Sequence, residues 1–108
     1  MSRTTTVHID LAAITENIRT LRGTLAAHRF MAVVKGDAYG HGAVQVAQHI
    51  EAIVDALAVA FTEEAVALRE MGVSAPLLIL EGPHTASDLA LAGKLNLWPV
   101  IHSDEQLE

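Results

Sequence analysis

The sequence predicts an α/β fold in which parallel strands alternate with helices. Short aliphatic runs recur along the chain, at about residues 30, 56, 77 and 97. Each run is separated from the next by a segment with helical periodicity, and this alternation is typical of βαβ units. Residues that cap or end helices stand between the runs, which supports the same division.

The first two expected elements are a helix and a buried strand. Asp10 is a good N-cap residue, and the apolar residues after it recur at spacings of three and four, as on one face of a helix. These residues are Leu11, Ile14, Ile18, Leu21 and Leu25. Residues 30–34 form a continuous apolar run, which is typical of a strand buried on both faces.

The centre of the chain continues the alternation. Val44, Ala47 and Ile50 share a helical face and precede the second expected strand, residues 55–60. The next helix is expected to have Thr62 as its N-cap.

Acidic residues follow that cap. Glu63 and Glu64 stand in the expected first turn, where the positive end of the helix dipole favours negative charge. Gly72 is expected to end the helix.

The last third of the chain contains two more expected strands, residues 77–80 and 97–101. The helix between them is expected to be capped by Thr85 or Ser87 and to close at Gly93.

A further helix opens near the end of the sequence. Ser103 and Gln106 match the spacing of a capping box, but only Leu107 and Glu108 follow. Such a helix is too short to be stable alone, and four parallel strands leave an exposed apolar edge. We therefore predict the N-terminal half of a (β/α)8 TIM-type barrel. Residues 1–108 are expected to be a truncated portion of that single domain, with the rest of the barrel absent.

Composition excludes several classes of function. The net charge of −6 argues against nucleic acid and anionic membrane surfaces as partners. No cysteine is present, so disulfides and thiolate metal sites are excluded. The sequence has neither a signal core nor an apolar run near the ~18 residues of a membrane span, so a cytoplasmic location is expected.

Lys35 stands in an unusual position, where the first expected strand stops and a glycine-rich segment begins. We expect its stem to lie against the apolar interior, while its amine emerges at the mouth of a loop. Desolvation there disfavours the ammonium form, and a neutral amine can attack an aldehyde to form a Schiff base. The glycines let the backbone approach a ligand closely, and Tyr39 offers a hydroxyl to an anionic group.

The segment Val33–Gly42, with the sequence VVKGDAYGHG, resembles the pyridoxal-phosphate lysine motif of the alanine racemase family. Further stretches agree with the family's opening helix and with its third and fourth strands in the proteobacterial style. These stretches are Val7–Ile14 with Asn17, Leu78–Gly82 and Trp98–Ser103. The resemblance therefore covers nearly the whole chain. Gly36 is the clearest departure, since an alanine is common at this position.

The resemblance implies an isomerase that uses pyridoxal 5'-phosphate to interconvert L-alanine and D-alanine, supplying D-alanine for peptidoglycan. It also implies a homodimer whose subunits are longer than this chain and carry a C-terminal β domain. Lys35 would be the Schiff-base lysine and one of two catalytic bases, and Tyr39 would bind the cofactor phosphate. Val33 and Leu80 would contact the cofactor ring.

Other parts of the implied site have no counterpart in this sequence. The family's second base is a tyrosine from the partner subunit, and the single tyrosine of this chain is Tyr39. None of the arginines matches those expected beneath the pyridine nitrogen and at the substrate carboxylate.

Each of these residues also has a plain structural interpretation. Lys35 could be a solvated loop lysine, Tyr39 could pack on its own turn, and Val33 and Leu80 could be barrel core. Asp37 is expected to form a turn through a bond from its side chain to the backbone.

Other polar residues are expected to have structural roles. Glu81 is expected to be a solvated loop carboxylate, and His41 is expected to shape the loop. The six histidines show no pair at i, i+3 or i, i+4, so no metal site is expected.

Three functional alternatives remain open. The chain alone could be a non-catalytic, cofactor-binding fragment that needs its missing half. It could also belong to a broad-specificity amino-acid racemase. A barrel decarboxylase using the same cofactor is a poorer match, because the segment 39–42 fits those enzymes badly.

Overall fold

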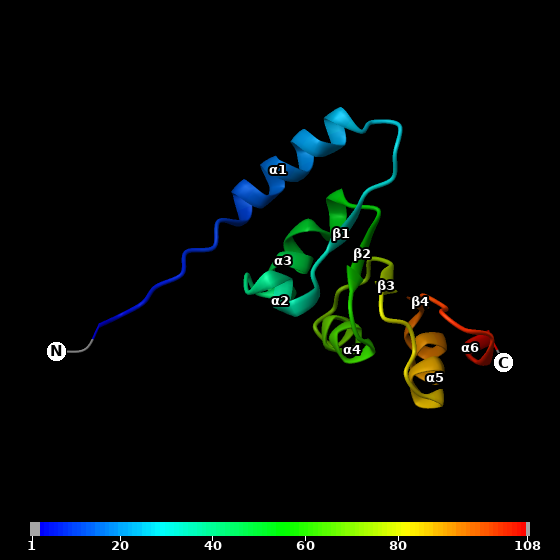
Figure 1. Ribbon diagram of the computed structural model, residues 1–108. Helices are drawn as coiled ribbons and strands as arrows, with labels where there is room; N and C mark the ends of the chain where they lie inside the picture. The colour runs from blue at the N-terminus through cyan, green and yellow to red at the C-terminus, as the bar shows by residue number, and fades with distance from the viewer. Residues whose placement is uncertain (1–2, 108) are drawn as a thin grey trace.

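Four parallel strands form one sheet in the order β1-β2-β3-β4 in the computed structural model, which describes residues 3–107 (Figure 1). The strands are β1 (Met31–Val33), β2 (Ala56–Val59), β3 (Leu77–Ile79) and β4 (Leu97–Pro99). All four predicted strands are therefore confirmed, together with the α/β fold class. Met1, Ser2 and Glu108, at the ends of the predicted domain, lie outside the described residues.

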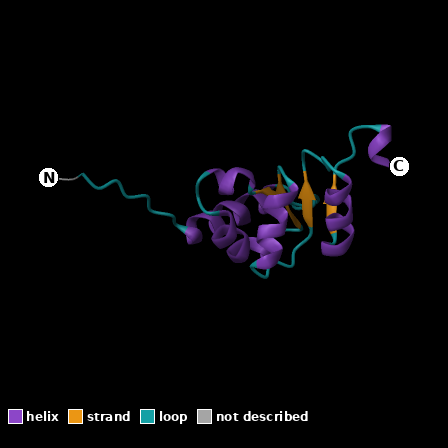
Figure 2. Ribbon diagram, turned by 90° about the horizontal axis from the view of Figure 1, so that it is seen from below, coloured by secondary structure: helices purple, strands orange, loops and turns teal. Residues whose placement is uncertain are grey.

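Helices occupy the connections between the strands. They are α1 (Leu11–Thr24), α2 (Lys35–Tyr39), α3 (Ala43–Ile50), α4 (Thr62–Glu70), α5 (Ala86–Leu95) and α6 (Asp104–Leu107), with a 3-10 turn at Glu51–Ile53. Figure 2 shows the N-terminal arm and α6 projecting from the body of the molecule in opposite directions. Within residues 3–107, no helix has both the length and the apolarity needed to cross a membrane.

The core lies between the sheet and its helices. In the register of the sheet, Ala32, Leu57, Leu77 and Leu97 are aligned across the four strands, and the three leucines are buried. The helices cover this row with small and aliphatic side chains, which are Val46, Ala47, Ile50, Ala65, Leu68 and Ala92. Each fully buried leucine or isoleucine contributes roughly 1.5–3 kcal/mol through removal of apolar surface from water.

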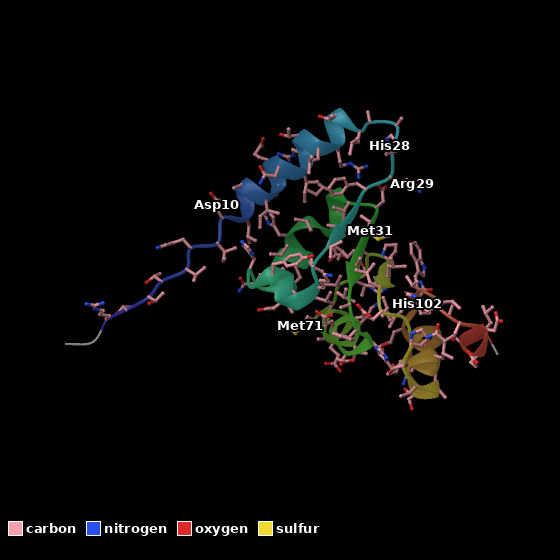
Figure 3. All side chains as sticks on the ribbon, in the orientation of Figure 1. Asp10, His28, Arg29, Met31, Met71 and His102 are labelled. Atoms are coloured by element: carbon pink, nitrogen blue, oxygen red, sulfur yellow. The ribbon has the colours of Figure 1, made fainter. Side chains whose placement is uncertain are left out.

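The opposite side of the sheet is only partly covered. Val33 and Trp98, at the two ends of the next aligned row, are 40% and 46% exposed, and Met31 is 40% exposed. Figure 3 shows Met31 on β1. The prediction that the first strand is buried on both faces is wrong, because β1 is an edge strand and its Met31 and Val33 side is partly open to solvent.

Two predicted helix caps are confirmed. Asp10 Oδ1 accepts a hydrogen bond from the Ala13 N–H at 3.0 Å, and Thr85 Oγ1 accepts one from the Asp88 N–H at 3.1 Å. Gly72, with φ of 88°, follows the end of α4 as predicted.

Two other helix boundaries differ from the prediction. Thr62 is the first helical residue of α4 and not its cap, because its hydroxyl is buried without a hydrogen-bond partner while Phe61 occupies the cap position. Helix α5 continues past Gly93 to Leu95 and ends at Asn96, which adopts a left-handed conformation with φ of 56°.

The predicted helix at the C-terminal end forms, but its first turn differs from a capping box. The Gln106 side chain reaches past Ser103 and accepts a hydrogen bond from the His102 N–H. It also donates to the Pro83 carbonyl at 2.9 Å, which joins this turn to the loop after β3.

Gly82 is required by the close approach of the loops after β3 and β4. Its φ is 76°, and a Cβ atom at this position would overlap the Val100 carbonyl oxygen.

We predict that Gly82→Ala lowers the free energy of unfolding by about 2 kcal/mol or more, because backbone strain and the overlap of the new Cβ atom both destabilise the folded state. Gly23→Ala in α1 is the matched control, since it meets open space and is expected to add up to about 1 kcal/mol. Urea denaturation measures both, and a Gly82→Ala protein as stable as the wild type would refute the explanation.

Asp55 connects α1 to the start of the sheet. Its Oδ2 accepts hydrogen bonds from the Phe30 N–H at 2.5 Å and from Arg22 Nη1 at 2.9 Å. These bonds, the backbone donor first, hold the pKa of Asp55 below its ordinary value of 3.8. The stability that this carboxylate contributes is therefore complete above the ordinary pKa and is lost as the pH falls through the lowered one.

Replacing Asp55 should therefore change the response to acid. We predict that Asp55→Asn makes the free energy of unfolding less steeply dependent on pH below about pH 4. Denaturant unfolding at a series of pH values measures this slope, with Asp104→Asn, at an exposed position, as the control. An Asp55→Asn protein with the acid sensitivity of the wild type would contradict this prediction.

Candidate functional site

The predicted site residues lie at the carboxyl ends of two strands. Val33 ends β1, Lys35 and Tyr39 are the first and last residues of α2, and Leu80 directly follows β3. The carboxyl ends of parallel strands meet at one edge of a sheet, where the active sites of (β/α)8 enzymes lie. The structure thus places Val33, Lys35 and Tyr39 on one continuous strand and turn, with β2 between them and Leu80.

Lys35 is half-buried and stands directly after an anchored residue. Val34 is 2% exposed in the core, and its N–H donates to the Ala58 carbonyl of β2 at 2.8 Å. The sheet therefore fixes the backbone that leads into Lys35.

The segment after Lys35 is a left-handed helical turn and not a simple glycine loop. Gly36, Asp37, Ala38 and Tyr39 have φ values of 60°, 57°, 56° and 55°. For a residue other than glycine this conformation costs roughly 1–2 kcal/mol. Such strain persists only where surrounding contacts enforce it, and it is frequent at functional sites. Gly36 adopts its conformation without that cost, so glycine suits the first position of the turn.

Local hydrogen bonds hold the turn. Asp37 Oδ1 accepts from the Ala43 N–H at 2.8 Å, and the Asp37 carbonyl accepts from the Gly42 N–H at 2.8 Å. His41 Nδ1 lies 3.0 Å from the Ala38 carbonyl oxygen. The expected turn-forming role of Asp37 and the loop-shaping role of His41 are both confirmed by these contacts.

The other predicted site residues differ in exposure. Tyr39 is 64% exposed. Leu80 is half-buried, and its carbonyl oxygen lies 3.2 Å from Nε2 of His102, which Figure 3 places near the end of β3. Glu81 is exposed, in agreement with the expected loop carboxylate.

Glu64, in the first turn of α4, also lies at the carboxyl ends of the strands. The sequence predicted only its place in a helix first turn. Its carboxylate accepts three hydrogen bonds, from the backbone N–H groups of Gly36, Ala60 and Phe61, each at 2.9 Å. An acidic residue in a helix first turn indicates bonds to the backbone at the beginning of that helix, which here are the bonds from Ala60 and Phe61. The contact with Gly36 spans 28 residues, and no sequence pattern indicates it.

The chain matches one family of known proteins. The model of the alanine racemase N-terminal domain matches residues 9–108. An alanine racemase of Alteromonas mediterranea is 44% identical over 108 residues, which are 100% of this chain and 30% of the relative. One of Pseudomonas taetrolens is 51% identical over 100 residues, which are 93% of this chain and 28% of the relative.

Solved structures agree with these matches. The biosynthetic alanine racemase of Pseudomonas aeruginosa superposes with a TM-score of 0.84 at 43% identity, covering 91% of this chain and 27% of that one. The enzyme of Acinetobacter baumannii gives a TM-score of 0.87 at 32% identity, covering 97% of this chain and 29% of that one. The chain thus spans less than a third of the relatives that it matches.

The bond from Asp37 gives a direct test of how the turn is held. We predict that Asp37→Ala lowers the free energy of unfolding by about 1–2 kcal/mol, because the Ala43 N–H loses its acceptor and alanine is strained in this conformation. Asp37→Asn keeps a side-chain oxygen and tolerates the left-handed region, so it should lose less than half as much. Denaturant unfolding of both variants measures the difference, and equal losses would exclude the side-chain bond as the cause.

Proposed function

Because this chain belongs to the alanine racemase family, we propose that it forms part of a pyridoxal-phosphate-dependent enzyme that interconverts L-alanine and D-alanine. The observation that carries the proposal is the position of Lys35. It is half-buried just after the carboxyl end of β1, between Val34, which is held in the core, and a strained turn. A solvated loop lysine would need neither a buried residue before it nor a strained turn after it. We therefore infer that these two constraints hold Lys35 for contact with a ligand.

The residues at this edge match the chemical groups of pyridoxal phosphate. The cofactor has an aldehyde, an anionic phosphate and a largely apolar ring. Lys35 provides an amine for the aldehyde, and Tyr39, an exposed residue, provides a hydroxyl for the phosphate. Val33 and Leu80 provide apolar surface for the ring, and Val33 is exposed on the side of β1 away from the helices.

In the proposed mechanism Lys35 has two tasks. Its amine holds the cofactor, and the same amine, when free, takes or returns the α-proton of the substrate on one face. The bound cofactor supplies an electron sink that makes this proton easier to remove. Tyr39 orients the cofactor through its phosphate, and the apolar side chains exclude water from one side of the ring.

The remaining parts of the mechanism are proposed to come from protein beyond this chain. They include the second base and the arginines that contact the pyridine nitrogen and the substrate carboxylate. We propose that residues 1–108 are the N-terminal portion of a barrel domain in a homodimeric enzyme that supplies D-alanine for peptidoglycan. The cytoplasmic location stays a prediction.

Covalent labelling tests the role of Lys35. The chain has two lysines, Lys35 and Lys94, and Lys94 is exposed on α5. After incubation with pyridoxal phosphate and reduction with borohydride, we predict that peptide mass spectrometry finds the adduct mainly on Lys35. Lys35→Ala should abolish this adduct, whereas Lys94→Ala should retain it. Equal labelling of the two lysines would contradict the proposal.

In a longer racemase containing these residues, Lys35→Ala should lower kcat by a factor of about 10² to 10⁴ or more.

A further inference from the structure

Glu64 joins two loops at the candidate site. It is the third residue of α4, and it is half-buried. Its Oε1 accepts the N–H groups of Ala60 and Phe61, which directly precede its own helix. Its Oε2 accepts the N–H of Gly36, which belongs to the turn after β1. Within residues 3–107 neither of the two ion pairs involves Glu64, so the carboxylate binds backbone N–H groups alone.

The contact with Gly36 acts on the conformation of Lys35. The Gly36 N–H is part of the peptide unit that joins Lys35 to Gly36, so its direction is set by the ψ angle of Lys35. On the other side of Lys35, the Val34 N–H is held by the Ala58 carbonyl. Both anchors come from β2 and the beginning of α4. Together they fix the direction in which the Lys35 side chain leaves the backbone.

Glu64 makes one hydrogen bond more than the capping of its own helix requires. The bonds to Ala60 and Phe61 already satisfy backbone donors at the beginning of α4, as an acidic residue at the third helical position commonly does. The third bond comes from a different loop, and its donor, the Gly36 N–H, adjoins the lysine at the centre of the site. Carboxylate bonds to backbone N–H groups are charge-assisted and stronger than neutral ones, so this one constrains the turn effectively.

We propose that Glu64 is a positioning residue for Lys35, holding its backbone so that the amine points toward the cofactor aldehyde. This inference rests on the proposed function of Lys35. In the covalent step the Lys35 nitrogen bonds to the aldehyde carbon and water leaves. Borohydride then transfers hydride to that carbon, and a proton from solvent completes the secondary amine. A misdirected lysine would complete the first step more slowly, because small displacements of a reacting group reduce rates strongly.

The test compares the rates of adduct formation at the two lysines of the same protein. Wild type, Glu64→Gln and Glu63→Gln are incubated with pyridoxal phosphate, quenched with borohydride at intervals and digested for mass spectrometry. Glu63 is the matched control, because it is the exposed neighbour in the same helical turn and loses the same charge. Thr85→Ala is a second control, which removes a helix cap far from Lys35. Glu64→Gln should lower the rate at Lys35 by about tenfold relative to Lys94, and both controls should leave that ratio unchanged.

Two further readouts separate positioning from general destabilisation. Hydrogen exchange at the Gly36 amide should accelerate in Glu64→Gln alone, and unfolding curves establish that every variant is folded at the temperature of labelling. An unchanged ratio of Lys35 to Lys94 labelling in folded Glu64→Gln would overturn the positioning role and leave Lys35 as the cofactor lysine. A wild type that shows no preference for Lys35 would overturn the proposed function, and the positioning role with it. The Gly36 exchange rate would still report whether the Glu64 contact exists.

Discussion

The parallel pairing of β1 with β2 is the constraint on which the candidate site depends. β1 has three residues, and among the described residues 3–107 it pairs with β2 alone, through Met31, Ala32 and Val33. The chain then continues through Val34, whose N–H also donates to β2, into Lys35. The sheet therefore determines where the backbone of Lys35 begins. The buried row of leucines on the helix-covered face of the sheet fixes the register, because a slip of one residue would move the whole row to the other face.

The turn after Lys35 stores strain and is held from two directions. Asp37 bonds forward to the beginning of α3, and Glu64 bonds to Gly36 from the beginning of α4. Both residues are carboxylates that accept backbone N–H groups, and such bonds are stronger than those between neutral groups. Two nearby helices thus support a conformation that Ala38 and Tyr39 would rarely adopt without such support. The result is a rigid base for Lys35 and an exposed Tyr39.

The sequence was sufficient for the order of elements, because continuous apolar runs and helical periodicity are local properties. Asp10 and Thr85 acted as the capping preferences of their residue types predict. The left-handed turn was not predictable in the same way, since three of its residues are not glycine and the enforcing contacts are tertiary. Thr62 failed as a cap for a related reason: packing buries its hydroxyl, and Glu64 takes over the donors at the beginning of the helix. The exposure of Met31 and Val33 could not be predicted either, because it depends on which other elements pack against β1, and local sequence does not encode this.

The chemistry of the site was inferred from residue types in one short segment, and the contact from Glu64 needed the fold. A crystal structure of the chain with pyridoxal phosphate would show whether Lys35 holds the cofactor. We predict continuous electron density from Nζ of Lys35 to the cofactor, with the phosphate at the Tyr39 hydroxyl. Cofactor bound elsewhere on the chain, with the Lys35 amine free, would contradict it.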